Sequence, residues 1–119
     1  MLSINNQQRY FLFGSVVDMR KGFDSLCGIV QSRLEKNPLS GDVYIFLNRR
    51  RTHIKLLLWE GDGFSIYYKR LEKGTYELPL CGSTNALAIT CNELLLMLRG
   101  ISLKKVHYRL RYQHKTADC

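Results

Sequence analysis

Four carboxylates are the residues of this sequence best suited to catalysis. Asp18, Asp24, Glu60 and Asp62 would support a two-metal nuclease if the fold brought them within a few ångströms of each other. Asp18 is also placed to cap a helix, and Asp62 to form a tight turn. Their spacing gives no reason for the four to converge, so a nuclease is a distant third hypothesis. We expect no catalytic residue.

Basic residues form the second candidate set, because they occur in separated groups beside tyrosines. Arginine and lysine neutralise phosphates and release counterions, and exposed tyrosines stack on bases. The residues we expect to contact DNA phosphates are Arg20, Lys21, Arg49, Arg50, Arg51, Lys55, Lys69 and Arg70. A solvated turn is the alternative for the triple arginine, and packing on the sheet is the favoured interpretation of Tyr68.

The charge of the whole chain agrees with a polyanionic partner. Its 119 residues include 18 basic and 10 acidic side chains, for a net charge of +8. Such a positive field attracts nucleic acid before other polyanions. The alternative interpretation is that the charge serves only to keep the protein soluble. No apolar run reaches the roughly 18 residues of a membrane span, and the first ten residues lack a signal-peptide pattern. We therefore expect a cytoplasmic protein that does not contact a membrane.

The cysteines and histidines give no sign of a metal site. Cys27, Cys81, Cys91 and Cys119 form no Cys-x-x-Cys pair, and the histidines do not stand at zinc-ligand spacing from them. No glycine-rich nucleotide-binding loop is present either. We expect reduced, unpaired thiols, no metal and no cofactor.

Hydrophobic periodicity predicts two helices and several strands. A helix is expected over 21–36, with Asp18 near its start and Asn37-Pro38 after its end. A second helix, over 91–99, begins with a capping box formed by Thr90 and Glu93. The predicted strands are 9–17, 42–48, 52–60, 64–71 and 75–78.

The order of these elements predicts the fold class. Gly61-Asp62-Gly63 is a strong hairpin signal between two of the strands. We predict an α+β fold, with an antiparallel sheet of four or five strands, a meander, and two packed helices. Phe46 and Trp59 are assigned to the core, and the three leucines Leu94, Leu95 and Leu98 are expected to face inward. The domain is expected to span residues 1–101, followed by a basic extension over 102–119.

Several motifs in order resemble a known bacterial family. They cover about residues 9–101: Asp18-Met19-Arg20-Lys21-Gly22-Phe23-Asp24, Pro38-Leu39-Ser40-Gly41, Phe46, Arg50, Lys55, Leu58-Trp59, Asp62-Gly63, Tyr68-Lys69-Arg70-Leu71-Glu72, Gly74, Pro79, Glu93-Leu94 and Gly100-Ile101. The chain is similar to the small accessory proteins, often called TnpB, encoded by the second reading frame of insertion sequences of family sixty-six. It departs from their pattern at Glu60, where many relatives have aspartate, and at Glu77-Leu78, where an aromatic residue is common.

The resemblance implies a part in transposition beside a separate, larger transposase that carries the catalytic acids. We therefore expect a non-catalytic accessory factor that contacts DNA at the element ends, the transposase, or both. The alternative is a protein-interaction module that reaches DNA only through the transposase. The basic residues form four groups: Arg20-Lys21, Arg49-Arg50-Arg51 with His53 and Lys55, Lys69-Arg70 with Lys73, and the segment 99–119. If all four groups lie on one face, direct DNA binding is favoured, whereas scattered groups favour the alternative.

Overall fold

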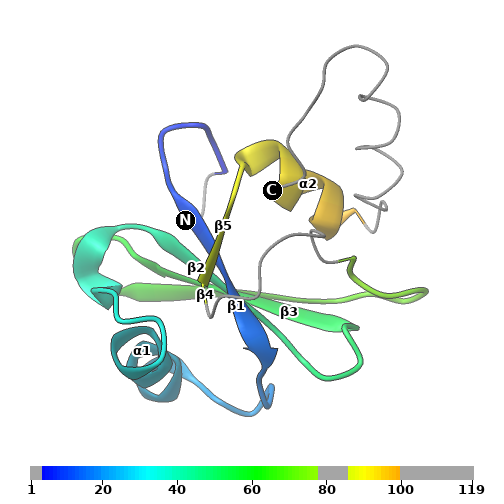
Figure 1. Ribbon diagram of the computed structural model, residues 1–119, viewed down its shortest axis with the longest axis horizontal. Coiled ribbons are helices and arrows are strands. Elements are labelled where there is room, and N and C mark those ends of the chain that lie inside the picture. Colours follow the sequence, from blue (N-terminus) through cyan, green and yellow to red (C-terminus); the bar gives the residue numbers. More distant parts are fainter. Residues whose placement is uncertain (1–3, 78–85, 100–119) are drawn as a thin grey trace.

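The computed structural model of the protein describes residues 4–77 and 86–99. These residues form five strands, two α-helices and a short 3₁₀ helix (Figure 1). In chain order they are β1 (Tyr10–Val16), α1 (Phe23–Ser32), η1 (Pro38–Ser40), β2 (Val43–Leu47), β3 (His53–Trp59), β4 (Phe64–Arg70), β5 (Ala86–Ile89) and α2 (Cys91–Leu98).

The strands form one sheet in the order β4-β3-β2-β1-β5. The predicted α+β class with two helices is confirmed, and β2, β3 and β4 form the expected antiparallel meander. The sheet is nevertheless mixed, because β1 pairs with β2 in parallel. Parallel neighbours need a crossover between them, and α1 supplies it by carrying the chain back across one face of the sheet.

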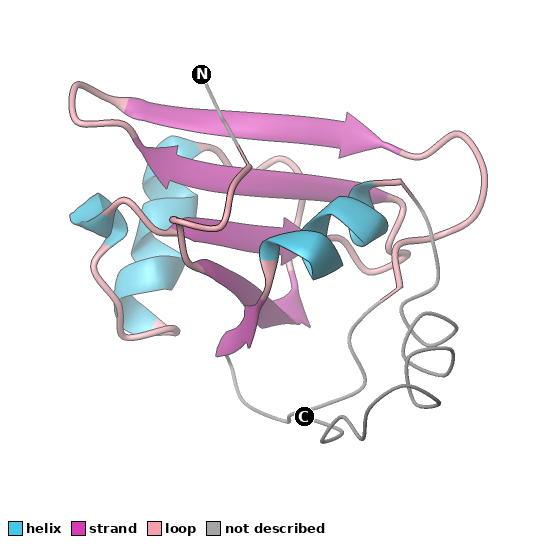
Figure 2. Ribbon diagram, turned by 90° about the horizontal axis from the view of Figure 1, so that it is seen from above, coloured by secondary structure: helices cyan, strands magenta, loops and turns pink. Residues whose placement is uncertain are grey.

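The two helices cover opposite faces of the sheet, as Figures 1 and 2 show. On one face, α1 contributes Leu26 and Val30 to a cluster with Tyr44 and Phe46. On the other, Leu94, Met97 and Leu98 of α2 join the second cluster. All five residues of β2 are buried, since this strand is covered on both faces.

Helix α1 is shorter than predicted and starts differently. Its N-cap is Gly22, which has no side chain to bond the first turn, so Asp18 is not the cap. The helix ends at Ser32 rather than near residue 36, because Glu35 takes a left-handed conformation with φ of 54°. The backbone N–H groups of Leu34 and Lys36 then close the helix on the carbonyls of Ile29 and Val30.

Helix α2 has the predicted capping box. The Thr90 hydroxyl accepts a hydrogen bond from the Glu93 backbone N–H at 3.1 Å, and the Glu93 carboxylate accepts one from the Thr90 N–H at 2.9 Å. The inward set was partly wrong: Leu95 is 36% exposed, and Met97 is fully buried in its place.

Two predictions about the strands also need correction. Residues 75–77 form no strand, although the Tyr76 ring is fully buried and its N–H bonds the Arg51 carbonyl at 2.7 Å. The fifth strand is instead β5, which was not predicted and which pairs with β1. Leu78, the tail over 102–119, Cys81 and Cys119 lie outside the described residues.

Of the two aromatic residues assigned to the core, only one is fully enclosed. Phe46 has no exposed surface. Trp59 is half-buried, and its ring packs at 4.9 Å from that of Phe64 across the β3–β4 hairpin. The Gly61-Asp62-Gly63 turn closes this hairpin as predicted, with the Glu60 N–H bonded to the Gly63 carbonyl and Gly61 at φ of 94°.

Candidate nucleic-acid interface

One row of paired residues crosses four strands and defines an end of the sheet. Val16 of β1 lies opposite Leu47 of β2, and Leu47 lies opposite Ile54 of β3. Ile54 in turn lies opposite Lys69 of β4. The carboxyl ends of β1, β2 and β4 therefore meet beside the start of β3.

The loops that leave this row hold most of the candidate basic residues. We call the surface made by residues 17–22, 48–52 and 70–76 the basic end. Its third segment is tied to its second by the hydrogen bonds from the N–H groups of Leu71 and Tyr76 to the carbonyls of Thr52 and Arg51. The exposed basic side chains of the predicted set that lie here are Arg20, Lys21, Arg49, Arg50, Arg51 and Arg70.

A single asparagine organises the triple-arginine loop. Asn48 Oδ1 accepts hydrogen bonds from the backbone N–H groups of Thr52 at 2.9 Å and His53 at 3.0 Å. Its Nδ2 donates to the Thr52 hydroxyl at 3.1 Å. Arg51 completes the turn in the left-handed region, at φ of 58°. The side chain of Asn48 thus fixes the backbone at the end of the loop, and all three arginine side chains are exposed.

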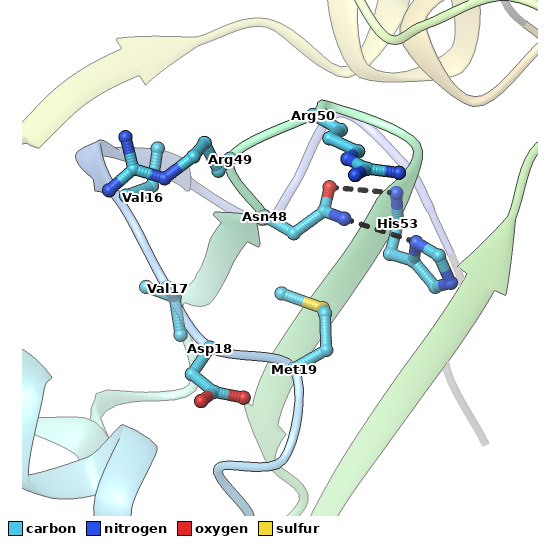
Figure 3. A pocket seen from close by; sticks show the side chains of 8 residues that line it. All are labelled: Val16, Val17, Asp18, Met19, Asn48, Arg49, Arg50 and His53. Carbon is cyan, nitrogen blue, oxygen red and sulfur yellow. Dashed lines mark hydrogen bonds between the residues drawn. The ribbon is translucent and has the colours of Figure 1, made fainter.

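The same network settles the tautomer of His53. Asn48 Nδ2 lies 3.2 Å from His53 Nδ1 (Figure 3). The Thr52 hydroxyl lies 2.8 Å from the same ring nitrogen. Since an amide nitrogen only donates, Nδ1 of the neutral ring accepts and the ring proton sits on Nε2. Sequence reasoning did not single out Asn48, although an asparagine four residues before a threonine at the start of a turn was a usable signal.

Asp18 organises the segment between β1 and α1 instead of capping the helix. Its carboxylate accepts hydrogen bonds from the Arg20 backbone N–H at 2.9 Å and from Arg20 Nη2 at 2.7 Å. These bonds lower the pKa of Asp18 to about 2. The Arg20 side chain is 90% exposed, but its charge is balanced by this partner. Lys21, next along the chain, is exposed.

Lys55 occupies a structural position that argues against its predicted contact with phosphate. The residue is 8% exposed, and its Nζ donates to the carbonyls of Met19 at 2.7 Å and Lys21 at 2.9 Å. The ammonium also lies 4.7 Å from the centre of the Tyr68 ring. A buried cation requires such partners. Lys55 therefore fastens the segment before α1 to the sheet.

Lys69 and Arg70 separate because neighbouring residues of a strand face opposite sides. Lys69 Nζ donates to the Leu98 carbonyl at 2.6 Å, at the end of α2. Arg70 is exposed at the basic end and lies 3.5 Å from the Glu72 carboxylate. Only Arg70 of this pair joins the loops described above.

A pocket of about 540 Å³ lies between the first two loops of the basic end. Figure 3 shows its wall formed by the end of β1 on one side and by the β2–β3 loop on the other. Val16, Val17 and Met19 supply apolar surface, while Arg49, Arg50 and His53 supply donors. Asn48 and the Asp18 carboxylate, whose charge is balanced by Arg20, complete the lining. Such a lining suits a group with an apolar portion and a negative charge.

Comparison with known proteins places the whole fold in a family. The family described as "IS66 Orf2 like protein" matches residues 8–108. The chain belongs to the IS66 Orf2-like family. It is 34% identical over 101 residues to y4hO of Sinorhizobium fredii (strain NBRC 101917 / NGR234), covering 85% of this chain and 87% of that protein.

A second S. fredii protein, y4jC, is 30% identical over 90 residues, covering 76% of each chain; both relatives are described as uncharacterized. No solved structure matches. Membership of the IS66 Orf2-like family supports an accessory role in the transposition of an insertion sequence.

The carboxylates considered for catalysis are distributed over both ends of the sheet of this IS66 Orf2-like protein. Asp18 lies at the basic end and Asp24 in the first turn of α1. Glu60 and Asp62 lie in the turn after β3, at the opposite end. Across residues 4–77 and 86–99, no three acidic, histidine or cysteine side chains gather in a way that could hold a metal ion.

Cys27 and Cys91 are half-buried free thiols, and burial raises the pKa of Cys27. No helix within the described ranges has the length and apolar character needed to cross a membrane.

Proposed function

We propose that this IS66 Orf2-like protein is a non-catalytic accessory factor that contacts DNA phosphates through the basic end while the element is transposed. The observation that carries the proposal is the convergence of three separated basic segments at one end of the sheet. The protein acts in the cytoplasm, beside the separate transposase of the same element. Phosphate contacts of this kind position a protein on DNA without reading its sequence.

The state of the arginines supports contact with an external anion. Among residues 4–77 and 86–99, no ion pair involves Arg49, Arg50 or Arg51. Their charges lie on a loop whose end is fixed by the hydrogen bonds from Thr52 and His53 to Asn48, which lowers the backbone ordering that a bound phosphate must impose. Arg70 adds a further exposed guanidinium across the β3–β4 pair.

The competing proposal is that the same surface binds the transposase and reaches DNA only through it. An acidic protein surface would also complement these arginines. The gathering of the basic segments at one end favours DNA, since scattered charges were the expectation for the alternative. Arg99 of the fourth basic group is exposed after α2, and the rest of that group lies outside the described residues.

Fluorescence anisotropy with labelled duplexes tests direct binding. One duplex carries the terminal repeat of the element and the other a scrambled sequence, and each is titrated across a salt series. Each phosphate contact contributes a log–log slope of about −0.9. Replacing Arg49, Arg50 and Arg51 with glutamine should flatten the slope by about two to three units. A preference for the repeat would identify end recognition.

The matched control removes three basic residues elsewhere. Arg9, Arg33 and Lys36 lie over the rings of Phe11 and Phe13, away from the basic end. Their replacement with glutamine changes the net charge equally, and we expect a flattening of less than one unit. Equal flattening by both triple variants would show that only net charge matters. Absence of binding by the unmodified protein near physiological salt would contradict the proposal and direct the work to a transposase pull-down.

A further inference from the structure

A second pocket adjoins the basic end on the outer strands. It encloses about 340 Å³ and is lined by His53, Tyr68, Arg70 and Glu72. His53 also lines the larger pocket beside Arg49 and Arg50, so one imidazole separates the two. The volume lies within the roughly 300–1,000 Å³ of small-molecule sites.

Tyr68 is held in a position unlike that of a packing residue. The sequence favoured sheet packing for it, but the residue is 52% exposed. Its ring is located by the Lys55 ammonium at 4.7 Å and by the His53 ring at 5.8 Å, inclined at 37°. Lys55 is itself fixed by two backbone carbonyls. An exposed aromatic ring on a rigid support suits stacking, because little side-chain freedom is lost on binding.

The polar groups around the Tyr68 ring are suited to contact the base and the phosphates of one nucleotide. Glu72 offers a carboxylate that accepts hydrogen bonds from base N–H groups, and His53 offers the Nε2 proton assigned above to base carbonyl oxygens. Arg70 on one side and Arg50 on the other offer guanidinium groups for the flanking phosphates. A base inside a duplex cannot reach such a pocket, since both of its faces are stacked.

We infer that the pocket of His53, Tyr68, Arg70 and Glu72 binds one unpaired DNA base, stacked on Tyr68, with the adjoining phosphates on Arg50 and Arg70. The inference rests on the proposed DNA binding and makes it specific: the protein recognises a single-stranded or unpaired position next to duplex. It also gives Lys55 a positioning role, because the ammonium supports both the Tyr68 ring and the segment that carries Lys21.

The test compares two adjacent tyrosines of β4 that lie on opposite faces of the sheet. Tyr68→Ala removes the proposed stacking ring, Tyr68→Phe keeps it, and Tyr67→Ala is the control, since Tyr67 is similarly exposed at 40%. Each full-length variant is titrated with a thymidine oligomer and with a duplex. We expect Tyr68→Ala to weaken oligomer binding about 5- to 150-fold, the range for one stacked base. Tyr68→Phe and Tyr67→Ala should bind like the unmodified protein.

The outcomes separate this inference from the broader proposal. Unchanged oligomer binding by Tyr68→Ala, or an equal loss in Tyr67→Ala, would overturn the stacking site while leaving duplex binding intact. Oligomers carrying 2-aminopurine give a second readout: its fluorescence should be quenched by the unmodified protein and by Tyr68→Phe, but not by Tyr68→Ala. Failure of the unmodified protein to bind either DNA would reject the proposed function and this inference together.

Discussion

The triple-arginine loop at the basic end differs from the opposite end of the sheet in how it holds its arginines, although Arg20 and Arg70 at the basic end are paired with Asp18 and Glu72. At the end opposite the basic end, Arg9 makes two hydrogen bonds to the buried carboxylate of Asp42, at 3.1 and 2.8 Å. Glu60 and Asp62 lie in the turn at that end as well. At the basic end, Arg49 and Arg50 line a pocket and pair with no carboxylate within the described ranges.

The contrast shows that net charge is a poor guide to a binding surface. A paired arginine such as Arg9 contributes to holding strands together, and its pKa is raised by Asp42. An unpaired arginine on a hydrogen-bonded loop keeps its attraction for an external anion. Paired arginines, unpaired arginines and the buried Lys55 all contribute to the net charge of +8. The proposed DNA contact rests on Arg49, Arg50 and Arg51, for which the described residues provide no ion pair.

Replacement of Tyr76 is expected to give the largest loss of stability at the basic end. The ring of this residue holds the third loop of the basic end in the core. Its ring is fully buried, burial raises the pKa of its phenol to about 12, and its N–H bonds the Arg51 carbonyl. Tyr76→Ala should reduce the free energy of unfolding by about 3–5 kcal/mol, as deletion of a buried aromatic ring does. Urea denaturation followed by circular dichroism measures this.

Tyr67→Ala is the matched control for that experiment, since Tyr67 is an exposed tyrosine of β4. Its effect should stay within about 0.5 kcal/mol. A loss for Tyr76→Ala no larger than that of the control would show that the loop is held by its backbone bonds alone.

A smaller effect is expected from Lys55, the buried cation beneath the basic end. Lys55→Met leaves the carbonyls of Met19 and Lys21 without their donor, at a cost of about 1–3 kcal/mol. The control is Lys36→Met, because Lys36 also lies over an aromatic ring, that of Phe11 at 4.1 Å, near the other end. It should change stability by less than about 0.5 kcal/mol. Equal losses in thermal or urea unfolding would contradict the special role of Lys55.

The smallest effect is expected for the change of stability with pH that follows from the ionisation of Asp18. Hydrogen bonds from Arg20 lower its pKa from an ordinary value near 4 to about 2. Because the folded-state pKa is depressed, the contribution of this carboxylate to stability is present above about pH 4 and is lost as the pH falls toward 2. Carbon-13 NMR of the carboxyl group should show a midpoint near pH 2, and Arg20→Gln should move it upward. An unchanged midpoint in Arg20→Gln would contradict the assignment, while Arg33→Gln should leave it in place.

Features set by neighbouring residues were largely predictable from the amino-acid order. The capping box at Thr90, the Gly61-Asp62-Gly63 hairpin and the apolar run of β2 all formed as expected. The motifs also indicated the IS66 Orf2-like family, which the comparison confirms. Capping bonds, turn conformations and strand alternation depend on contacts within a few residues, so local sequence is enough to specify them.

Features set by distant segments depended on the tertiary structure. Lys55 and Tyr68 read from the sequence as a phosphate contact and a packing residue, yet Lys55 is buried and Tyr68 is exposed. The position of Lys55 depends on residues 19–21, more than thirty positions earlier in the chain, whose carbonyls accept its hydrogen bonds. Tyr68 lies on β4, which the strand order places at the edge of the sheet. The sequence by itself determined that basic residues would be abundant and grouped. Only the pairing of β1, β2, β3 and β4 decided that three groups share one end, because strand order and direction follow from the packing of the whole core.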